Sequence, residues 1–336
     1  MVTIEEVAKD ANVSIASVSY AMNNKTGVSK KTKKRIIESA EKLGYIPNSL
    51  AQSLLTDKTN VIGLVIPGIT GPFRGQFVDS LTRYAQQSGY YLMIGITDGK
   101  VDREKEIIKT FISKMIDALI IVPDDDRNNE FYAQISKLAD KRNLPFLIAL
   151  MHIEDVNASF VTSDHMEGHY MLASYLFNCG YKDIVYTNVT NKYYHLQKSK
   201  GFKKAAAEAG VDVRIFDVVI NEIYDEYKIG CQFMKNFFEN GEPLPQLFIA
   251  ATSMFAYGMV NIIHEHGLRI PEDVGITGFD SSVLPEFEPI SLTTVSTLTD
   301  SISRYCVEVV CAENYRIREI IVKPELIIGE STLSSV

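Results

Sequence analysis

Hydroxyl, amide and cationic side chains are concentrated in the first 35 residues of the chain. Thr3 and Glu6 have the spacing of a capping box, in which the Thr hydroxyl accepts from a backbone N–H and Glu6 reaches back to the Thr amide. Ser14 and Ser29 are suitable N-caps for two further helices. Five cations then open the third helix, where side chains and helix dipole together favour phosphate: Lys30, Lys31, Lys33, Lys34 and Arg35.

Three short helices must position these groups. Their inner faces are indicated by apolar residues at helical spacing: Ile4, Val7, Ala8 and Ala11 in the first, Val18, Ala21 and Met22 in the second, and Ile36, Ile37, Ala40 and Leu43 in the third. Two helices joined by a tight turn and completed by a third form a helix-turn-helix.

The second helix leaves Ile15, Ala16, Ser17 and Tyr20 outside the predicted core. These side chains carry no charge, so the helix can enter a DNA major groove without burying a carboxylate. Hydroxyls can bond base edges, and apolar groups can touch thymine methyls. The alternative is a three-helix adaptor with a solvated basic face.

The stretch TIEEVAKDANVSIASVSYAMN, followed by GYIPNSLAQSL, resembles the DNA-binding headpiece of the LacI/GalR transcription regulators, without a gap from Thr3 to Leu54. The resemblance implies base and phosphate contacts at Ser14, Ile15, Ala16, Ser17, Tyr20, Asn23, Ser29 and Thr32. It implies hinge contacts at Tyr45, Asn48, Ala51 and Leu54, and we also expect DNA contacts at Thr3 and Ile4. Tyr20 replaces the usual arginine of the recognition helix, so the DNA half-site should differ from the common family operator.

Residues 47–60 are expected to form a hinge helix and linker. Pro47 suits a first helical turn, but a helix of about eight residues is marginal alone. It should therefore fold only when DNA and a partner hinge order it. Leu54 would wedge into a minor-groove base step and kink the duplex, or alternatively pack on the core domain.

From Val61 onward, apolar runs and amphipathic stretches alternate with the period of βαβ units. The runs that read as buried parallel strands are 61–66, 91–96, 118–122, 145–150, 183–187, 246–250 and 273–277. Because these exceed one ordinary sheet, two doubly wound lobes are predicted, with region 151–164 as a crossover and a cleft at the carboxyl ends of the strands.

The body also carries family blocks, among them IGLVIPGITGPFRGQFVDSL, VTSDHMEGHYMLASYL and GLRIPEDVGITGFDSS. They resemble the type I periplasmic-binding-protein fold, so the predicted class is α/β: an all-α helix-turn-helix domain plus a two-lobed, doubly wound parallel-sheet core. The expected domains are 1–46, 47–60 and 61–336, with an N-lobe of about 61–160 and 291–324 and a C-lobe of about 161–290 and 325–336. The resemblance implies a homodimer whose effector changes the angle between the lobes.

Several cleft positions depart from the sugar-binding pattern of the family. Asp164 and Asp280 match it, but lysine stands at Lys198 for the usual arginine, Thr252-Ser253 stands for N-D, and Ala149-Leu150-Met151 stands for I-D-R. Because lysine does not replace the bidentate guanidinium grip, we expect an effector other than a neutral sugar. It would be an anionic metabolite held by Lys198 and Arg74, or a protein corepressor on the flank.

The expected effector residues are thus Phe73, Arg74, Asp164, Lys198, Tyr224, Ser253 and Asp280, with Phe73 and Tyr224 as aromatic contacts; ordinary lobe packing is the alternative for each. His165 and His169 stand four apart on a helix, which is metal-site spacing, but we favour satisfied helix histidines. Asp124-Asp125-Asp126 is expected to be solvated surface. The sequence contains no P-loop, G-x-G-x-x-G or G-x-S-x-G motif, so we expect no metal, no cofactor and no enzymatic activity.

Charge is divided unevenly along the 336 residues. Residues 1–60 contain nine Lys or Arg against six Asp or Glu, whereas the remainder contains 25 against 36, within a net charge of −8. A small basic module on an acidic body fits a protein that meets double-stranded DNA at its front end. With no apolar run long enough for a membrane and no signal-peptide pattern, we expect a cytoplasmic, dimeric repressor of a pseudo-palindromic operator. The alternative is a small-molecule-binding or carbohydrate-processing protein without DNA function.

Overall fold

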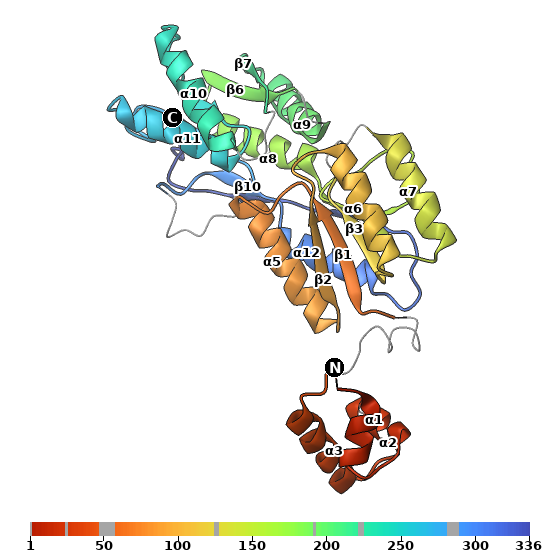
Figure 1. Ribbon diagram of the computed structural model, residues 1–336. Coiled ribbons are helices and arrows are strands. Elements are labelled where there is room, and N and C mark those ends of the chain that lie inside the picture. Colours follow the sequence, from red (N-terminus) through yellow and green to blue (C-terminus); the bar gives the residue numbers. More distant parts are fainter. Residues whose placement is uncertain are drawn as a thin grey trace. The chain divides into compact units, whose positions relative to one another are not determined.

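The computed structural model describes residues 2–23, 26–46, 58–123, 128–190, 193–220, 225–280 and 289–336. It divides into two compact units, Met1–Thr59 and Asn60–Val336 (Figure 1). The first unit is helical and the second is built on parallel sheets, which confirms the predicted fold class.

The first unit consists of α1 (Ile4–Asp10), α2 (Ile15–Met22) and α3 (Lys30–Leu43). Thr3, Ser14 and Ser29 cap these helices through their side chains, and the capping box of Thr3 and Glu6 is complete. The buried apolar side chains form one small core from all three helices: Val7, Ala8, Ala11, Val18, Ala21, Ile36 and Ala40. The predicted helix-turn-helix is therefore present.

The prediction for the inner face of α3 was wrong at one position. Ile37 is 38% exposed, whereas Ser39 is buried. Positions 36, 39, 40 and 43 follow the spacing of a single helix face, and Ile37 lies one residue off it. The Ser39 hydroxyl donates to Asp10 at 2.7 Å, and Lys42 Nζ donates to the same carboxylate at 2.7 Å, so Asp10 joins α1 to α3.

The N-lobe of the second unit is a six-stranded parallel sheet in the order β11-β5-β4-β3-β1-β2. Its strands are β1 (Val61–Ile66), β2 (Tyr91–Ile96), β3 (Ala118–Ile121), β4 (Phe146–Ala149), β5 (Ser159–Ser163) and β11 (Glu319–Val322). Helices α5 (Pro72–Gln87) and α12 (Thr299–Val310) pack on one face of the sheet, and α6 (Val101–Ser113) and α7 (Asn129–Lys141) pack on the other (Figure 1).

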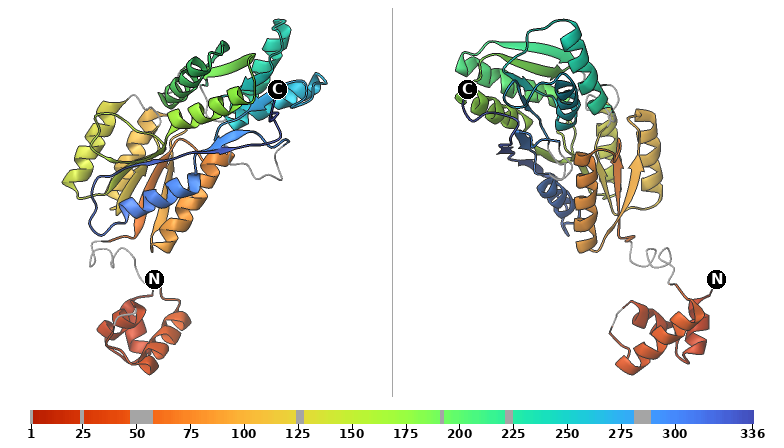
Figure 2. Two further views of the ribbon diagram at one scale, coloured as in Figure 1. Left: turned by 180° about the vertical axis from the view of Figure 1, so that it is seen from behind. Right: turned by 90° about the vertical axis from the view of Figure 1, so that its left-hand side faces the viewer.

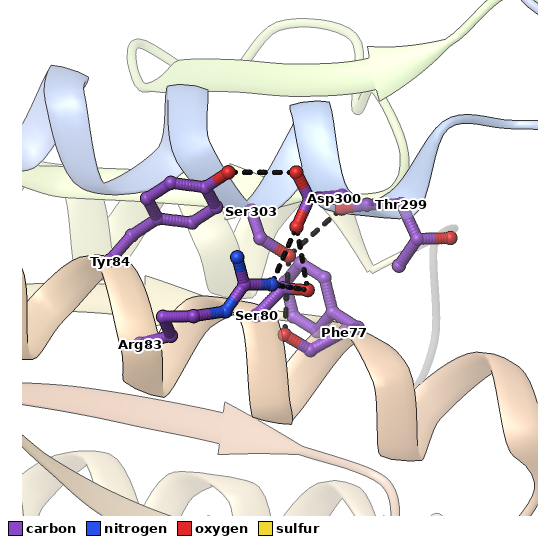
Figure 3. Close-up of polar contacts among 7 residues, drawn as sticks. All are labelled: Phe77, Ser80, Arg83, Tyr84, Thr299, Asp300 and Ser303. Carbon is purple, nitrogen blue, oxygen red and sulfur yellow. Dashed lines mark hydrogen bonds and ion pairs between the residues drawn. The ribbon is translucent and has the colours of Figure 1, made fainter.

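A polar network joins α5 to α12, which are far apart in sequence (Figure 3). Asp300 accepts hydrogen bonds from Ser80 Oγ at 3.0 Å, Arg83 Nη2 at 2.8 Å and Tyr84 Oη at 2.7 Å. Partial burial raises the pKa of Asp300, but these donors outweigh it and hold the pKa below its ordinary value. Nearby, the Ser303 hydroxyl lies within hydrogen-bond distance of the Phe77 carbonyl.

The C-lobe is a four-stranded parallel sheet in the order β7-β6-β8-β9. Its strands are β6 (Ile184–Val189), β7 (Val213–Val218), β8 (Leu247–Ile249) and β9 (Gly275–Thr277). Helices α8 (His165–Asn178) and α9 (Tyr193–Ala209) pack on one face, and α10 (Glu226–Glu239) and α11 (Ser253–Glu265) pack on the other. Figure 2 shows the lobes from two further sides, with helices on both faces of each sheet.

The chain passes between the lobes at the segment joining β5 to α8 and again beside the antiparallel pair of β10 (Thr294–Ser296) and β12 (Glu325–Ile327). The seven predicted apolar runs all overlap strands of the two large sheets. Region 151–164, which we expected to form only a crossover between the lobes, contains β5. The residues Ser159-Phe160-Val161-Thr162-Ser163 are buried on both faces, so hydroxyl side chains interrupt the apolar run by which such strands are identified.

Candidate nucleic-acid interface and small-molecule pocket

The outer face of α2 is uncharged and accessible. Ile15 is 48% exposed and Tyr20 is 45% exposed, whereas Val18 and Ala21 are buried against the other two helices. Ala16 is also exposed. The helix therefore presents apolar groups and a phenol to its surroundings and anchors itself through the opposite face.

Two pairs of hydroxyls lie at the starts of α2 and α3. Ser14 Oγ accepts from the Ser17 amide at 3.1 Å and lies 2.9 Å from Ser17 Oγ. Ser29 Oγ accepts from the Thr32 amide at 3.2 Å and lies 2.9 Å from Thr32 Oγ1. The structure thus pairs Ser17 with the N-cap residue Ser14, and Thr32 with the N-cap residue Ser29. Each hydroxyl pair lies at the positive end of a helix dipole.

The ring of Tyr20 lies against Gly27. A Cβ placed on Gly27 would come within 3.2 Å of Tyr20 Cδ2. The φ of Gly27 is 122°, a conformation that side-chain-bearing residues rarely adopt. The glycine therefore permits both the turn before α3 and the close approach of the phenol ring.

The remaining predicted DNA contacts lie around these helices. Asn23 ends α2, and its side-chain Nδ2 donates to the Ser19 carbonyl at 2.9 Å. Thr3 and Ile4 lie at the start of α1. Tyr45 is half-buried, and burial, together with the charge of Glu5, raises its pKa. The hinge predictions Asn48, Ala51 and Leu54 lie outside the described residues.

The predicted basic cluster is largely accessible. Lys30, Lys31, Lys34 and Arg35 are exposed, and Lys33 is half-buried. Lys34 and Glu38 are 3.8 Å apart and exposed, so this pair neutralises little of the local charge. The start of α3 is therefore a cationic helix terminus suited to phosphate.

A pocket of about 320 Å³ lies between the two lobes of the second unit. It is formed by the starts of three helices and the segment after β9. The lining residues are Thr70, Gly71, Pro72, Phe73 and Arg74 at α5, Glu226 and Tyr227 at α10, Thr252, Ser253 and Met254 at α11, and Phe279 and Asp280 after β9. Four of the seven predicted effector residues thus meet here: Phe73, Arg74, Ser253 and Asp280.

Asp164 and Lys198 are not among the residues that line the pocket. Asp164 caps α8, where its Oδ1 accepts from the Glu167 amide at 2.9 Å. Lys198 is only 1% exposed, and Tyr224 lies outside the described residues. Eight lining residues were not among the predicted effector residues, and Glu226, Tyr227 and Met254 are three of these.

Lys198 lies behind the pocket wall. Its Nζ is 3.2 Å from Asp280 Oδ2 and 3.8 Å from the centre of the Phe279 ring. Burial lowers the pKa of Lys198, and the charge of Asp280 opposes this shift. The lysine is therefore engaged by the protein itself, which argues against the expectation that it grips an anionic ligand.

The two helical histidines lie beside the Phe279 ring, His169 buried and His165 half-buried. The His169 ring is tilted against Phe279 at 4.3 Å between ring centres, and its Nδ1 has no hydrogen-bond partner within the described structure. The expectation of satisfied histidines is therefore not met at His169 Nδ1. Burial lowers the pKa of His165 and places that of His169 well below its ordinary value.

In the described part of the chain, no group of three or more His, Cys, Asp or Glu side chains is arranged to hold a metal ion. Across those same residues, no helix has the length and apolar character needed to cross a bilayer.

Comparison with known proteins finds two matching family models and several relatives. The family model "Bacterial regulatory proteins, lacI family" matches residues 3–48, and the model "Periplasmic binding protein-like domain" matches residues 173–332. Catabolite control protein A of Priestia megaterium is 30% identical over 297 residues, covering 88% of this chain and 87% of that protein. The HTH-type transcriptional repressor PurR of Pasteurella multocida (strain Pm70) is 27% identical over 342 residues, covering 99% of both chains.

A similar solved structure is the lac repressor dimer bound to operator and the anti-inducer ONPF. It has a TM-score of 0.83 at 21% identity and covers 99% of both chains. The two-part fold of this chain is therefore that of known regulators. From the headpiece motif, the fold and the identity to catabolite control protein A together, the chain belongs to the lacI family of bacterial regulatory proteins.

Proposed function

We propose that the protein is a cytoplasmic repressor that binds a pseudo-palindromic DNA operator as a homodimer and acts by binding rather than by catalysis. The observation that carries this proposal is the outer face of α2, where Ile15, Ala16 and Tyr20 are exposed and uncharged while the opposite face is buried. An α-helix of this kind fits the major groove, and the cationic start of α3 suits the flanking phosphates.

Each exposed group on α2 has a chemical role at a base edge. Ile15 and Ala16 can contact thymine methyl groups, and Ser17 can accept or donate one hydrogen bond. Tyr20 offers one hydroxyl where the family usually has the two-pronged guanidinium. We infer that this position of the half-site is read by a single hydrogen bond and by ring contact, not by a bidentate pair with guanine.

The proposed homodimer and operator draw support from the relatives. The lac repressor structure is a dimer on its operator, and the PurR relative is named a repressor. A dimer of this chain would present two headpieces to two half-sites related by twofold symmetry. We propose that Tyr45, Asn48, Ala51 and Leu54 contribute the hinge contacts between them.

We propose that the pocket between the lobes binds a small-molecule effector. Phe73 and Arg74 reach it from the N-lobe, and Ser253 and Asp280 from the C-lobe. A ligand that touches both lobes changes the equilibrium between their relative positions by its differential affinity for them. A protein corepressor on the flank of the core is the other form that this regulation can take.

The test is selection of operator sequences from a random duplex pool by the full-length protein, followed by titration of the selected duplex. We expect a pseudo-palindromic consensus, preferred over random competitor by at least about a thousandfold. Tyr20→Ala should weaken binding and relax the consensus. Tyr91→Ala, which removes an exposed tyrosine of the other unit, serves as the matched control. Failure to enrich any sequence contradicts the proposed function.

A further inference from the structure

The charged residues of the pocket carry opposite signs on opposite lobes. Arg74 lies in the first turn of α5 on the N-lobe, and Glu226 lies at the start of α10 on the C-lobe. Asp280 is the third charged residue of the lining. Within the described residues, Arg74 makes no ion pair or hydrogen bond, so its guanidinium remains available to a ligand.

The two carboxylates retain acceptor capacity. Asp280 uses Oδ2 for Lys198, while its Oδ1 is buried and has no hydrogen-bond partner in the described structure. Glu226 accepts from the Thr252 hydroxyl through Oε2 at 2.7 Å. Both residues line the pocket and both carry acceptor oxygens, so a ligand that brings an N–H group to this wall can donate a hydrogen bond to it.

The rest of the lining is mainly apolar and aromatic. Phe73, Tyr227, Met254 and Phe279 contribute side chains, and the volume of about 320 Å³ is at the small end of the range for ligand sites. The pocket therefore suits a compact molecule with a modest apolar part. A large or strongly hydrated ligand fits it poorly.

From this pattern we propose that the effector is a small zwitterion of the amino-acid type, with a carboxylate facing Arg74 and an ammonium facing Glu226 and Asp280. This inference rests on the proposed function, because it names the ligand of the effector pocket. A neutral sugar leaves the charges of Arg74 and Glu226 without a partner of opposite charge, and a simple anion faces two carboxylates. A simple cation leaves Arg74 without a partner. Only opposite charges on one molecule match the lining.

The proposed ligand would also couple the lobes. Its carboxylate would bind the N-lobe through Arg74, and its ammonium would bind the C-lobe through Glu226. Both charge-assisted hydrogen bonds form together only when the lobes hold the two residues at a fitting separation. The zwitterion would thus favour one relative position of the lobes over others, which is the requirement for regulation by population shift.

The experiment is a thermal-shift screen of the full-length protein with each of the proteinogenic L-amino acids at millimolar concentration. For the amino acid with the largest shift, calorimetry then compares the parent compound, its carboxamide and its N-acetyl derivative. We expect the parent to bind and each derivative to bind at least about tenfold more weakly, because each lacks one charge-assisted contact.

Two variants assign the charges to residues. Arg74→Gln should abolish the difference between the amino acid and its carboxamide, and Glu226→Gln should reduce the difference between the amino acid and its N-acetyl derivative. Arg142→Gln and Glu239→Gln alter exposed residues outside the pocket and should change neither ratio. The assignment of the ligand charges to Arg74 and Glu226 is overturned if the control variants change these affinity ratios as much as the pocket variants do.

The zwitterion is overturned if no amino acid shifts the melting temperature, or if the derivatives bind as tightly as the parent. Operator selection without ligand separates this outcome from failure of the proposed function. If the protein selects an operator but binds no amino acid, only the zwitterion proposal is contradicted. If it selects no duplex, the proposed repressor function is contradicted as well.

Discussion

The ammonium of Lys198 lies 3.2 Å from Asp280 Oδ2, and the two side chains differ in their access to solvent. The Lys198 side chain is 1% exposed, whereas that of Asp280 is 17% exposed and borders the pocket. Loss of the carboxylate would leave a cation in a dry interior, but loss of the lysine would leave a carboxylate that water in the pocket can reach. The pair is therefore asymmetric in its effect on stability.

We expect Asp280→Asn to lower the free energy of unfolding by about 3–5 kcal/mol, as for other buried charges that lose their partner. Lys198→Met should lower the free energy of unfolding less, because water in the pocket can hydrate the exposed part of Asp280. The thioether of the introduced methionine can also still pack on Phe279. The double variant should recover part of the loss. Urea denaturation of the core measures all three, and a larger cost for Lys198→Met than for Asp280→Asn contradicts the asymmetry.

His169 should make the core acid-sensitive. Burial holds its pKa well below the ordinary value of 6.5, so below about pH 6.5 the unfolded chain takes up a proton that the folded chain excludes. The free energy of unfolding is therefore undiminished by this histidine above that pH. It falls as the pH decreases, by up to about 1.4 kcal/mol per pH unit for one such group. His169→Leu should reduce this slope in urea titrations between pH 7.5 and 5.5.

The exposed His264 provides the control for this measurement. His264→Leu should leave the slope as in the unchanged protein. His165, whose pKa burial also lowers, should preserve part of the acid sensitivity in the His169 variant. An unchanged slope after His169→Leu would show that His169 does not contribute to the acid sensitivity.

Local patterns in the sequence predicted the headpiece well because its structure depends on local chemistry. The caps at Thr3, Ser14 and Ser29 and the buried Val18 and Ala21 follow from hydrogen-bonding capacity and helical spacing over a few residues. The misassigned Ile37 marks the limit of this reasoning, since two adjacent isoleucines cannot both lie on one narrow face.

The pocket was harder to predict because it is made by residues far apart in sequence. Arg74, Ser253 and Asp280 could be identified through family motifs, but the engagement of Lys198 by Asp280 depends on how α9 packs beside the end of β9. Glu226 carries no local signal, since a single glutamate at a helix start usually serves the helix dipole. Its proximity to Thr252 follows only from the contact between α10 and α11.

The basic start of α3 should determine the salt dependence of operator binding. A variant with Lys30, Lys31 and Lys34 replaced by alanine keeps the half-buried Lys33 and the apolar face of the helix. For each of these lysines that binds a phosphate, its replacement should reduce the slope of log affinity against log salt by about 0.9. Titrations by fluorescence anisotropy at several salt concentrations measure this slope. A slope equal to that of the unchanged protein contradicts phosphate binding by these lysines.

Tyr20 should read one base position through its hydroxyl and its ring, and Gly27 should keep that ring in place. Tyr20→Phe removes only the hydroxyl and retains the contact with Gly27, so we expect a loss of about 0.5–1.5 kcal/mol on the preferred operator. The loss should disappear on duplexes substituted at the base pair that the hydroxyl reads. Competition titrations with singly substituted operators locate that base pair. A Tyr20→Phe loss of equal size on every substituted duplex would mean that the hydroxyl acts on a phosphate, because phosphate contacts carry no sequence information.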